Sequence, residues 1–416
     1  MTTAQNGRKP LGDAELFTRV QEHTFRWFLE RADPSSGMVP DRTSSRAGIV
    51  ATGGTGFAVM VLIVGAERGF ISRDAALERT TLIVATLERA DLYHGAVPHW
   101  IDVRSGKAEP FSEKDDGGDL VETALLMQGL LTAREYFDRD EAAERDLRQR
   151  INVLWHAVEW PFYKAADDDV LLWHWSPTFG FAINHAIRGW NECLITYVLA
   201  AASPSHPIDP ELYHRGWTHS PVFVNGESAY GVTLPLGPPM GGPLFFAHYS
   251  FLGLDPRGLA DRYADYFEQN RRHVEINRAY CIANPKGFAG YGPDCWGLTA
   301  SDNHQGYAGH SPTNDFGVIT PTAALSSFPY APEAAMAAMR HFHDDLGSRI
   351  WTDWGFSDAF SETHDWYSSE HLAIDQGPIV IMMENYRSGL LWRLFMQAPE
   401  VRVGLDRLGF FPPRVA

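Results

Sequence analysis

The chain has 416 residues, of which 44% are hydrophobic and 21% charged, a composition typical of globular proteins with a sizeable core. Its formal net charge of −17 argues against nucleic acid or an anionic membrane surface as a partner. Aromatic residues make up 12%, and several of the 13 Trp lie among Gly, Pro and polar residues, where flat rings can support sugar rings. The composition therefore favours a carbohydrate substrate.

The cysteines and the N-terminal stretch set the expected compartment. Cys193, Cys281 and Cys295 follow no zinc-ligand spacing and cannot all pair, so no disulfide framework is expected. Residues 1–20 carry several charges and lack the apolar segment of a secretory signal. We expect a cytoplasmic protein without a membrane partner, or a periplasmic one if a signal peptide was removed.

Apolar periodicity predicts helices along most of the chain. The expected helices span residues 14–32, 57–67, 72–90, 116–131, 138–158, 193–202, 243–252, 255–281, 331–346 and 374–396, with a short one after 314–317. A small hairpin is expected near 222–232, whereas 283–313 and 351–367 are expected to be loops.

Two kinds of helix alternate in this order. Helices that are apolar nearly all round begin with a glycine and a polar cluster, at residues 52–56, 115–122, 189–192, 313–317 and 374–378. Helices with one charged face lie between them. Because a helix without a polar side is buried, the alternation predicts two concentric rings of antiparallel helices, an all-α (α/α) barrel or toroid. We expect one domain over residues 1–416 with a small β-containing insertion near 203–243.

In such a barrel the N-termini of the inner helices meet at one mouth. The residues gathered there would be Asp119, Glu122, Trp190, Asn191, Glu192, Asp315, Asp375 and Gln376. The acids crowd the start of the helix near 116–131, which favours a site, although capping of that helix by Asp115 or Asp116 is the alternative.

Paired carboxyl groups are what glycoside hydrolysis requires. Glu192 lies between an aromatic residue and an apolar run, where burial would raise its pKa and suit it to be a general acid, with capping of its own helix as the alternative. Asp375 is the expected partner across the ring, with N-capping before Pro378 as the alternative. Asp119 and Glu122 are further catalytic candidates, as base or as ligands of sugar hydroxyls and water.

Other residues are expected to bind the sugar. Trp173, Trp175, Trp190, Tyr291 and Trp296 would stack on sugar rings, with a place in the core as the alternative for each of them. Arg188, Asn191 and Gln376 would hold hydroxyls. No zinc motif, serine elbow, phosphate loop or dinucleotide fingerprint is present, so we expect no metal and no cofactor, although Ca²⁺ would suit Asp115, Asp116 and Asp119.

Several motifs resemble those of the glucoamylase-like family, which includes glycoside hydrolase family 144, the bacterial β-1,2-glucanases. They are residues 98–100 (Pro-His-Trp), 115–131, 189–192 (Gly-Trp-Asn-Glu), 197–208, 287–301, 354–360 and 374–386. The likeness runs from about residue 15 to residue 410.

The resemblance implies an (α/α)6 barrel and anomer-inverting hydrolysis of β-1,2-linked glucans or their oligosaccharides. Glu192 resembles the general acid, and Asp115, Asp119 and Glu122 match the acidic block of the cleft; Asp375 is placed by its motif position and by the expected geometry of the ring. A cytoplasmic enzyme would meet imported oligosaccharides, which favours exo action. A transglycosylase, or an oligosaccharide-binding protein without turnover, is the alternative, and the sequence leaves the oligomeric state open.

Overall fold

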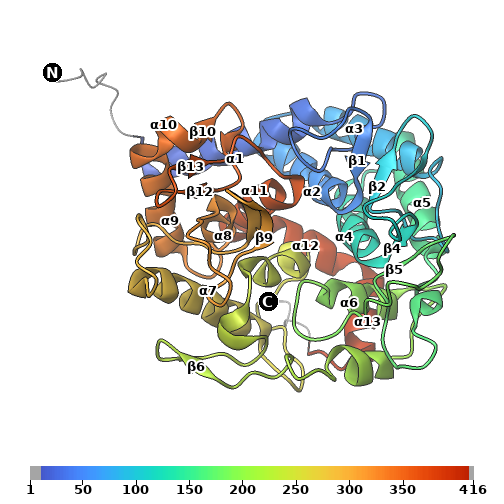
Figure 1. Ribbon diagram of the computed structural model, residues 1–416. Coiled ribbons are helices and arrows are strands. Elements are labelled where there is room, and N and C mark those ends of the chain that lie inside the picture. Colours follow the sequence, from blue (N-terminus) through green and yellow to red (C-terminus); the bar gives the residue numbers. More distant parts are fainter. Residues whose placement is uncertain (1–10, 412–416) are drawn as a thin grey trace.

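The computed structural model describes residues 11–411, which form a mostly helical body (Figure 1). Its α-helices are α1 (Asp13–Arg31), α2 (Thr52–Arg68), α3 (Arg73–Leu87), α4 (Leu120–Tyr136), α5 (Ala142–Ala157), α6 (Leu194–Ala202), α7 (Tyr266–Ala283), α8 (Pro321–Leu325), α9 (Pro332–Arg340), α10 (Gly347–Ile350), α11 (Ala373–Ser388), α12 (Leu390–Gln397) and α13 (Pro399–Arg407). Single 3-10 or π turns lie at Trp160–Tyr163, Tyr213–Trp217, Pro239–Gly241, Leu244–Ala247, Tyr249–Leu252 and His341–Asp345.

The helices differ in burial as the sequence predicts. Helices α2, α4, α6 and α11 are buried along most of their length, because their sequences are apolar nearly all round. Helices α1, α3, α5 and α7 bury one face and expose the other. Helix α2 packs against α4 and α11, and α4 packs against α6, so the N-termini of the buried helices lie near one another.

Helices α2 and α4 approach closely through glycines. A Cβ atom at Gly129 would lie 2.1 Å from the carbonyl oxygen of Gly56, and one at Gly56 would lie 2.4 Å from that of Leu125. No side chain larger than hydrogen fits at either position without moving a backbone. The glycines therefore bring the first turns of α2 and α4 together.

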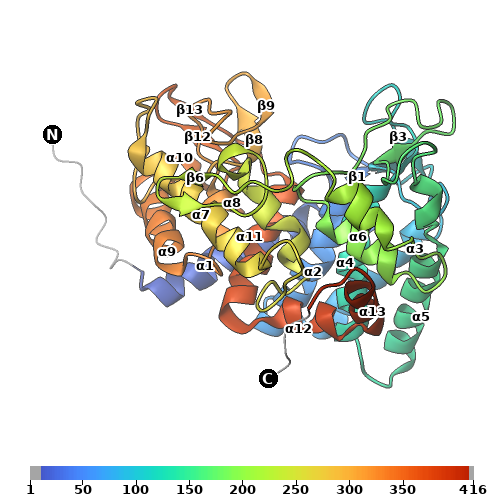
Figure 2. The same cartoon turned by 90° about the horizontal axis from the view of Figure 1, so that it is seen from below.

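Short strands occupy the loops. Strands β1 (Ile49–Ala51), β2 (Trp100–Asp102) and β3 (Lys107–Glu109) form one antiparallel sheet. The antiparallel pairs are β4 (Gly118–Asp119) with β5 (His174–Trp175), β6 (Ser228–Ala229) with β7 (Val232–Thr233), β8 (Ala300–Asn303) with β9 (Gly306–Gly309), β10 (Trp351–Thr352) with β11 (Gly355–Phe356), and β12 (Phe360–Ser361) with β13 (Trp366–Tyr367). In Figure 2 the hairpins lie along one side of the molecule and α12 and α13 along the other.

The structure corrects several expected boundaries. The segments 283–313 and 351–367 hold hairpins instead of plain loops, and strands are not confined to 203–243. Helix α7 begins at Tyr266 instead of near 255, where Asp265 caps it by accepting from the Glu268 N–H at 2.9 Å. The last predicted helix breaks at Gly389, whose φ of 66° ends α11.

Within residues 11–411 no helix is long and apolar enough to cross a membrane. Part of the stretch behind the signal-peptide expectation, residues 1–10, lies outside the described residues. The cytoplasmic location and the single-domain organisation stay predictions.

Candidate active site

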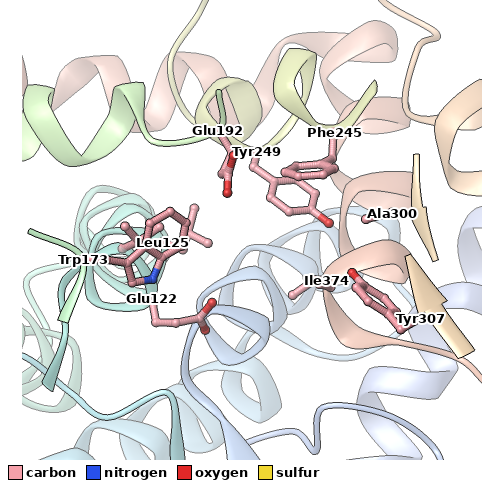
Figure 3. Close-up of a pocket in the computed structure, with 10 residues that line it drawn as sticks. Glu122, Leu125, Trp173, Glu192, Phe245, Tyr249, Ala300, Tyr307 and Ile374 are labelled. Carbon is pink, nitrogen blue, oxygen red and sulfur yellow. The ribbon is translucent and has the colours of Figure 1, made fainter. Parts of the chain in front are cut away.

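A cavity of about 140 Å³ lies beside the N-termini of α4, α6 and α11 (Figure 3). Its lining is formed by Val121, Glu122, Leu125, Trp173, Glu192, Phe245, Tyr249, Ala300, Tyr307 and Ile374. Most of these side chains are apolar or aromatic, and Glu122 and Glu192 extend into the space from opposite walls (Figure 3). A mostly apolar pocket with a few converging polar groups is the usual form of a ligand site.

Glu192 lies just before α6, in a segment fixed by Ser250. The Ser250 hydroxyl donates to the backbone carbonyl of Glu192 and accepts from the N–H of Ile195 at 3.0 Å. Burial, with a smaller contribution from the charge of Glu122, raises the pKa of Glu192 to about 7. A large fraction of Glu192 is therefore protonated at neutral pH.

Glu122 belongs to the first turn of α4 and is held by α2. Its Oε2 accepts a hydrogen bond from the N–H of Gly53 at 2.6 Å. Burial raises the pKa of Glu122 to about 7, although the positive charge of His99 opposes this rise. A Cβ atom at Gly53 would also lie 2.6 Å from Oε2, so a glycine is needed for this contact.

Asp119 is fully buried and acts as the N-cap of α4. Its Oδ1 accepts from the N–H groups of Val121 at 3.0 Å and Glu122 at 2.9 Å. Its Oδ2 accepts from Trp173 Nε1 at 3.2 Å and bonds to His99 Nδ1 at 3.1 Å. The cap is thus Asp119 itself and not Asp115 or Asp116. Because both of its oxygens are engaged, Asp119 is better suited to position Trp173 and His99 than to react.

His99 is a site residue that sequence reasoning did not single out, although it lies in the Pro-His-Trp motif. Burial opposes its charge, but Glu122 and Asp119 outweigh this and raise the pKa of His99 to about 10. Burial and the charge of Asp119 raise the pKa of nearby Asp115 to about 6. Ligand atoms of His99, Asp115 and Asp119 lie within 4.8 Å of one another. Within this set His99 Nδ1 and Asp119 Oδ2 form an ion pair at 3.1 Å.

Asp375 lies behind the cavity wall, next to Asp358. Both side chains are 1% exposed, and within residues 11–411 neither carboxylate oxygen of Asp375 has a hydrogen-bond partner. Burial raises the pKa of Asp358 to about 7, and burial together with Asp358 raises the pKa of Asp375 well above its usual value. The charge of Asp358 therefore disfavours the ionised form of Asp375. Ile374 lines the cavity but Asp375 does not.

The structure places Trp190 and Trp296 in the core, outside the cavity lining. Trp190 is 2% exposed and stacks on Tyr266, with ring centroids 5.6 Å apart. Trp296 is fully buried, and its Nε1 donates to the carbonyl of Ala334 at 3.4 Å. Neither ring has a free face for a sugar. Both fill the core, where large aromatic rings are as useful as in a binding site.

The remaining predicted residues lie outside the cavity lining. Arg188 pairs with Asp168, and Asn191 Oδ1 accepts from the N–H of Cys193 at 2.9 Å. The Tyr291 hydroxyl donates to Asp315 Oδ1 at 2.7 Å, and Gln376 Nε2 donates to the Phe356 carbonyl at 3.3 Å. Trp175 packs edge-on against His94, with centroids 5.4 Å apart. In this structure these polar groups bind protein partners.

Phe245, Tyr249 and Tyr307 line the cavity but were missed from the sequence. They come from the 3-10 turns Leu244–Ala247 and Tyr249–Leu252 and from strand β9. No local pattern distinguishes them from other aromatic residues, because their position depends on how these segments cross the helix ends.

Comparison with known proteins relates the chain to carbohydrate-active enzymes. Residues 184–399 match the family described as "Putative glucoamylase". The chain is 44% identical over 420 residues to an exo β-1,2-glucooligosaccharide sophorohydrolase (non-reducing end) of Parabacteroides distasonis. That match covers 96% of this chain but only 58% of the Parabacteroides protein.

Solved structures are similar over nearly the whole chain. An endo-β-1,2-glucanase from Chitinophaga pinensis, in complex with sophorotriose and glucose, is 53% identical with a TM-score of 0.94, over 97% of this chain and 100% of that one. An endo-β-1,2-glucanase from Talaromyces funiculosus, in complex with sophorose, has a TM-score of 0.69 at 12% identity, over 96% of this chain and 91% of that one. The second likeness is one of fold alone.

Proposed function

Because the chain belongs to the glucoamylase-like family that contains β-1,2-glucanases, we propose that it is a glycoside hydrolase acting on β-1,2-linked glucans or their oligosaccharides. The observation that carries this proposal is the pair Glu122 and Glu192, which enter one aromatic cavity from opposite walls (Figure 3). Glycoside hydrolysis uses such a pair, one carboxyl protonated and the other ionised.

The charged groups near each carboxyl favour Glu192 as the acid and Glu122 as the base. His99 lies beside Glu122 and favours its ionised form, whereas no cation is among the groups that shift the pKa of Glu192. Glu192 then holds the proton and donates it to the oxygen of the leaving sugar. Glu122 accepts a proton from a water molecule, whose oxygen bonds to the anomeric carbon as the glycosidic bond breaks. Attack from the face opposite the leaving group inverts the anomer.

Asp375 is the alternative general base. Burial and the charge of Asp358 raise the pKa of Asp375 well above its usual value, so Asp375 would have to lose its proton before it could act as a base. Since Asp375 does not line the cavity, it would need a water molecule or a hydroxyl to reach the substrate. Tyr249 and Tyr307, whose pKa values are raised by burial and then by the charge of Asp375, carry hydroxyls of this kind on the wall.

Aromatic rings would hold the sugar. Trp173 lines the cavity with its Nε1 fixed by Asp119, so its orientation is set before substrate arrives. Phe245, Tyr249 and Tyr307 supply rings on the other walls (Figure 3). Asp115, half-buried beside His99, has an oxygen without a partner in the described chain and is available for a sugar hydroxyl.

We also infer that the helices form an (α/α)6 barrel and one catalytic domain. Successive contacts of α2 with α4, α4 with α6, α6 with the turn Tyr249–Leu252, α8 with α11, and α11 with α2 support a closed inner ring. The remaining step of the ring is bridged by His248 Nε2 and the Ser327 hydroxyl, 3.1 Å apart. The outer helices α1, α3 and α5 lie against this ring.

Incubation with β-1,2-, β-1,3-, β-1,4- and α-1,4-linked glucose oligosaccharides tests the proposal. We expect cleavage of the β-1,2 series alone, with the new reducing end appearing first as the α-anomer in proton NMR. Product lengths distinguish exo from endo action. Longer products would indicate transfer, and binding without products would indicate a carbohydrate-binding protein; either result would contradict the hydrolase assignment.

A further inference from the structure

Three potential metal ligands from distant parts of the chain meet away from the cavity. One ligand atom each of Cys295, His341 and Glu362 lies within 4.8 Å of the other two. Cys295 follows α7, His341 begins the π turn after α9, and Glu362 lies in the turn between β12 and β13. None of the three lines the cavity. Sulfur, imidazole nitrogen and carboxylate oxygen together form a donor set typical of zinc.

The ring of His341 is oriented for such a role. Its Nδ1 lies 2.8 Å from Asp345 Oδ2, which fixes the tautomer with the proton on Nδ1. Its Nε2 is buried and has no hydrogen-bond partner within residues 11–411. Histidines that bind metal ions nearly always donate their other ring N–H to a carboxylate, a carbonyl or water. The nitrogen left without a partner is the one a metal ion would use.

The backbone around the other two ligands is also fixed. Gly290 has a φ of 84°, and a Cβ atom there would lie 2.0 Å from Glu362 Oε1. The carboxylate is thus packed directly against the loop that leads to Cys295. The N–H of Ala289 donates to the Thr363 hydroxyl at 2.7 Å, which joins the same two loops. The cluster is therefore part of an ordered junction.

We propose that Cys295, His341 and Glu362 bind one zinc-type divalent ion, with water as the fourth ligand. Tetrahedral zinc takes sulfur at about 2.3 Å and nitrogen or oxygen at about 2.0–2.2 Å, so ligand atoms that now lie within 4.8 Å of one another would move closer together around the ion. On binding, the thiol releases its proton to solvent and the thiolate bonds to the ion. Thiolate and carboxylate together neutralise the charge of the ion. Cys295 is 3% exposed, whereas His341 and Glu362 are half-buried and leave a path for entry.

The ion would join segments that the chain itself leaves far apart. It would hold the loop before β8 to the end of α9 and to the β12–β13 turn. That loop carries Tyr291, whose hydroxyl donates to Asp315. The site would thus stabilise a loop on the side of the molecule that carries the hairpins (Figure 2).

Zinc content of the full-length protein tests the proposal. The protein is incubated with Zn²⁺, freed of unbound metal and analysed by mass spectrometry of the metal; we expect about one zinc ion per chain, as for a specific site. Cys295→Ser should reduce this to the level of the buffer, whereas Cys281→Ser, a change at another buried thiol, should leave it intact. With Co²⁺ in place of zinc, the wild type and Cys281→Ser should show a thiolate charge-transfer band that Cys295→Ser lacks.

Glu362→Gln keeps the thiol and should weaken zinc binding by about 10-fold or more, as loss of a ligand does. Circular dichroism of each variant checks that it is folded. A folded wild type that retains no zinc would overturn the proposal. Equal zinc content in wild type and Cys295→Ser would also overturn it. If that zinc were lost in His99→Gln, the ion would be bound by the cluster of His99, Asp115 and Asp119 instead.

Discussion

Replacing Glu192 by Gln removes the proposed proton donor and changes the shape of the cavity little. No side chain within residues 11–411 hydrogen-bonds the Glu192 carboxyl, so the fold should tolerate the change. General acid catalysis contributes about 10² to 10⁴-fold, so kcat/KM on a β-1,2-glucooligosaccharide should fall by that factor. At 1.36 kcal/mol per tenfold this is about 2.7 to 5.4 kcal/mol of transition-state stabilisation.

The loss should depend on pH and on the leaving group. Because Glu192 must be protonated and its pKa is about 7, kcat/KM of the wild type should decline as pH rises above that value. The variant should lack this decline. An aryl β-sophoroside with a 4-nitrophenol leaving group needs little protonation, so its hydrolysis should suffer much less.

The assay compares both substrates over pH with wild type, Glu192→Gln and, as a matched control, Glu333→Gln on the exposed face of α9. The control should behave as wild type. A loss below about tenfold would be too small for a general acid and would refute the assignment. Equal losses on the two substrates would refute it as well.

Four further outcomes are expected. Glu122→Gln should lower kcat by about 10² to 10⁴-fold and regain turnover with added azide, which attacks the anomeric carbon in place of water, needs no base and leaves a glycosyl azide; the same rescue in Asp375→Asn instead would make Asp375 the general base. Gly53→Ala should reduce activity at least tenfold and lower the melting temperature, because its methyl group meets Glu122 Oε2 at 2.6 Å; an unchanged rate would contradict the contact. Trp173→Ala should cost about 1–3 kcal/mol of binding, measured by calorimetry with sophorose oligosaccharides; unchanged affinity would remove the ring from the site. The pKa of Asp358 is raised from 3.8 to about 7 in the folded protein. The stability that its protonated form contributes is therefore full below the lower value and is lost as the pH rises through 7. Thermal melts of Asp358→Asn should therefore decline less between acid and alkaline pH than those of wild type, and parallel curves would contradict this.

Local sequence patterns predicted what depends on local structure. The apolar run after Glu192 predicted a carboxyl with a raised pKa, and in the structure burial raises the pKa of Glu192 to about 7; its role as general acid stays a prediction. The pattern of wholly apolar helices predicted the buried helices α2, α4, α6 and α11. Both features follow from residues within one or two turns of each other. The β-1,2-glucan assignment came instead from the family resemblance.

Features that depend on tertiary packing were predicted poorly. Trp173 and Trp296 have similar local surroundings of polar residues, Gly and Pro, yet one lines the cavity and the other is fully buried. Asp119 was grouped with the catalytic acids because its partners Trp173 and His99 are distant in sequence. The cluster at Cys295 has no recognisable spacing for the same reason.

The glycine contact between α2 and α4 has a consequence for how this scaffold can diversify. Gly56 and Gly129 let α2 and α4 approach, and Gly53 of α2 then holds Glu122 by its backbone N–H. Trp173 and Tyr307, by contrast, lie in connecting segments outside the long buried helices. Exchange of the segments that carry these two rings could therefore retune chain length or linkage preference while the contact between α2 and Glu122 is kept. An engineer could graft loops from a relative onto this helical framework and expect to change selectivity before catalytic power.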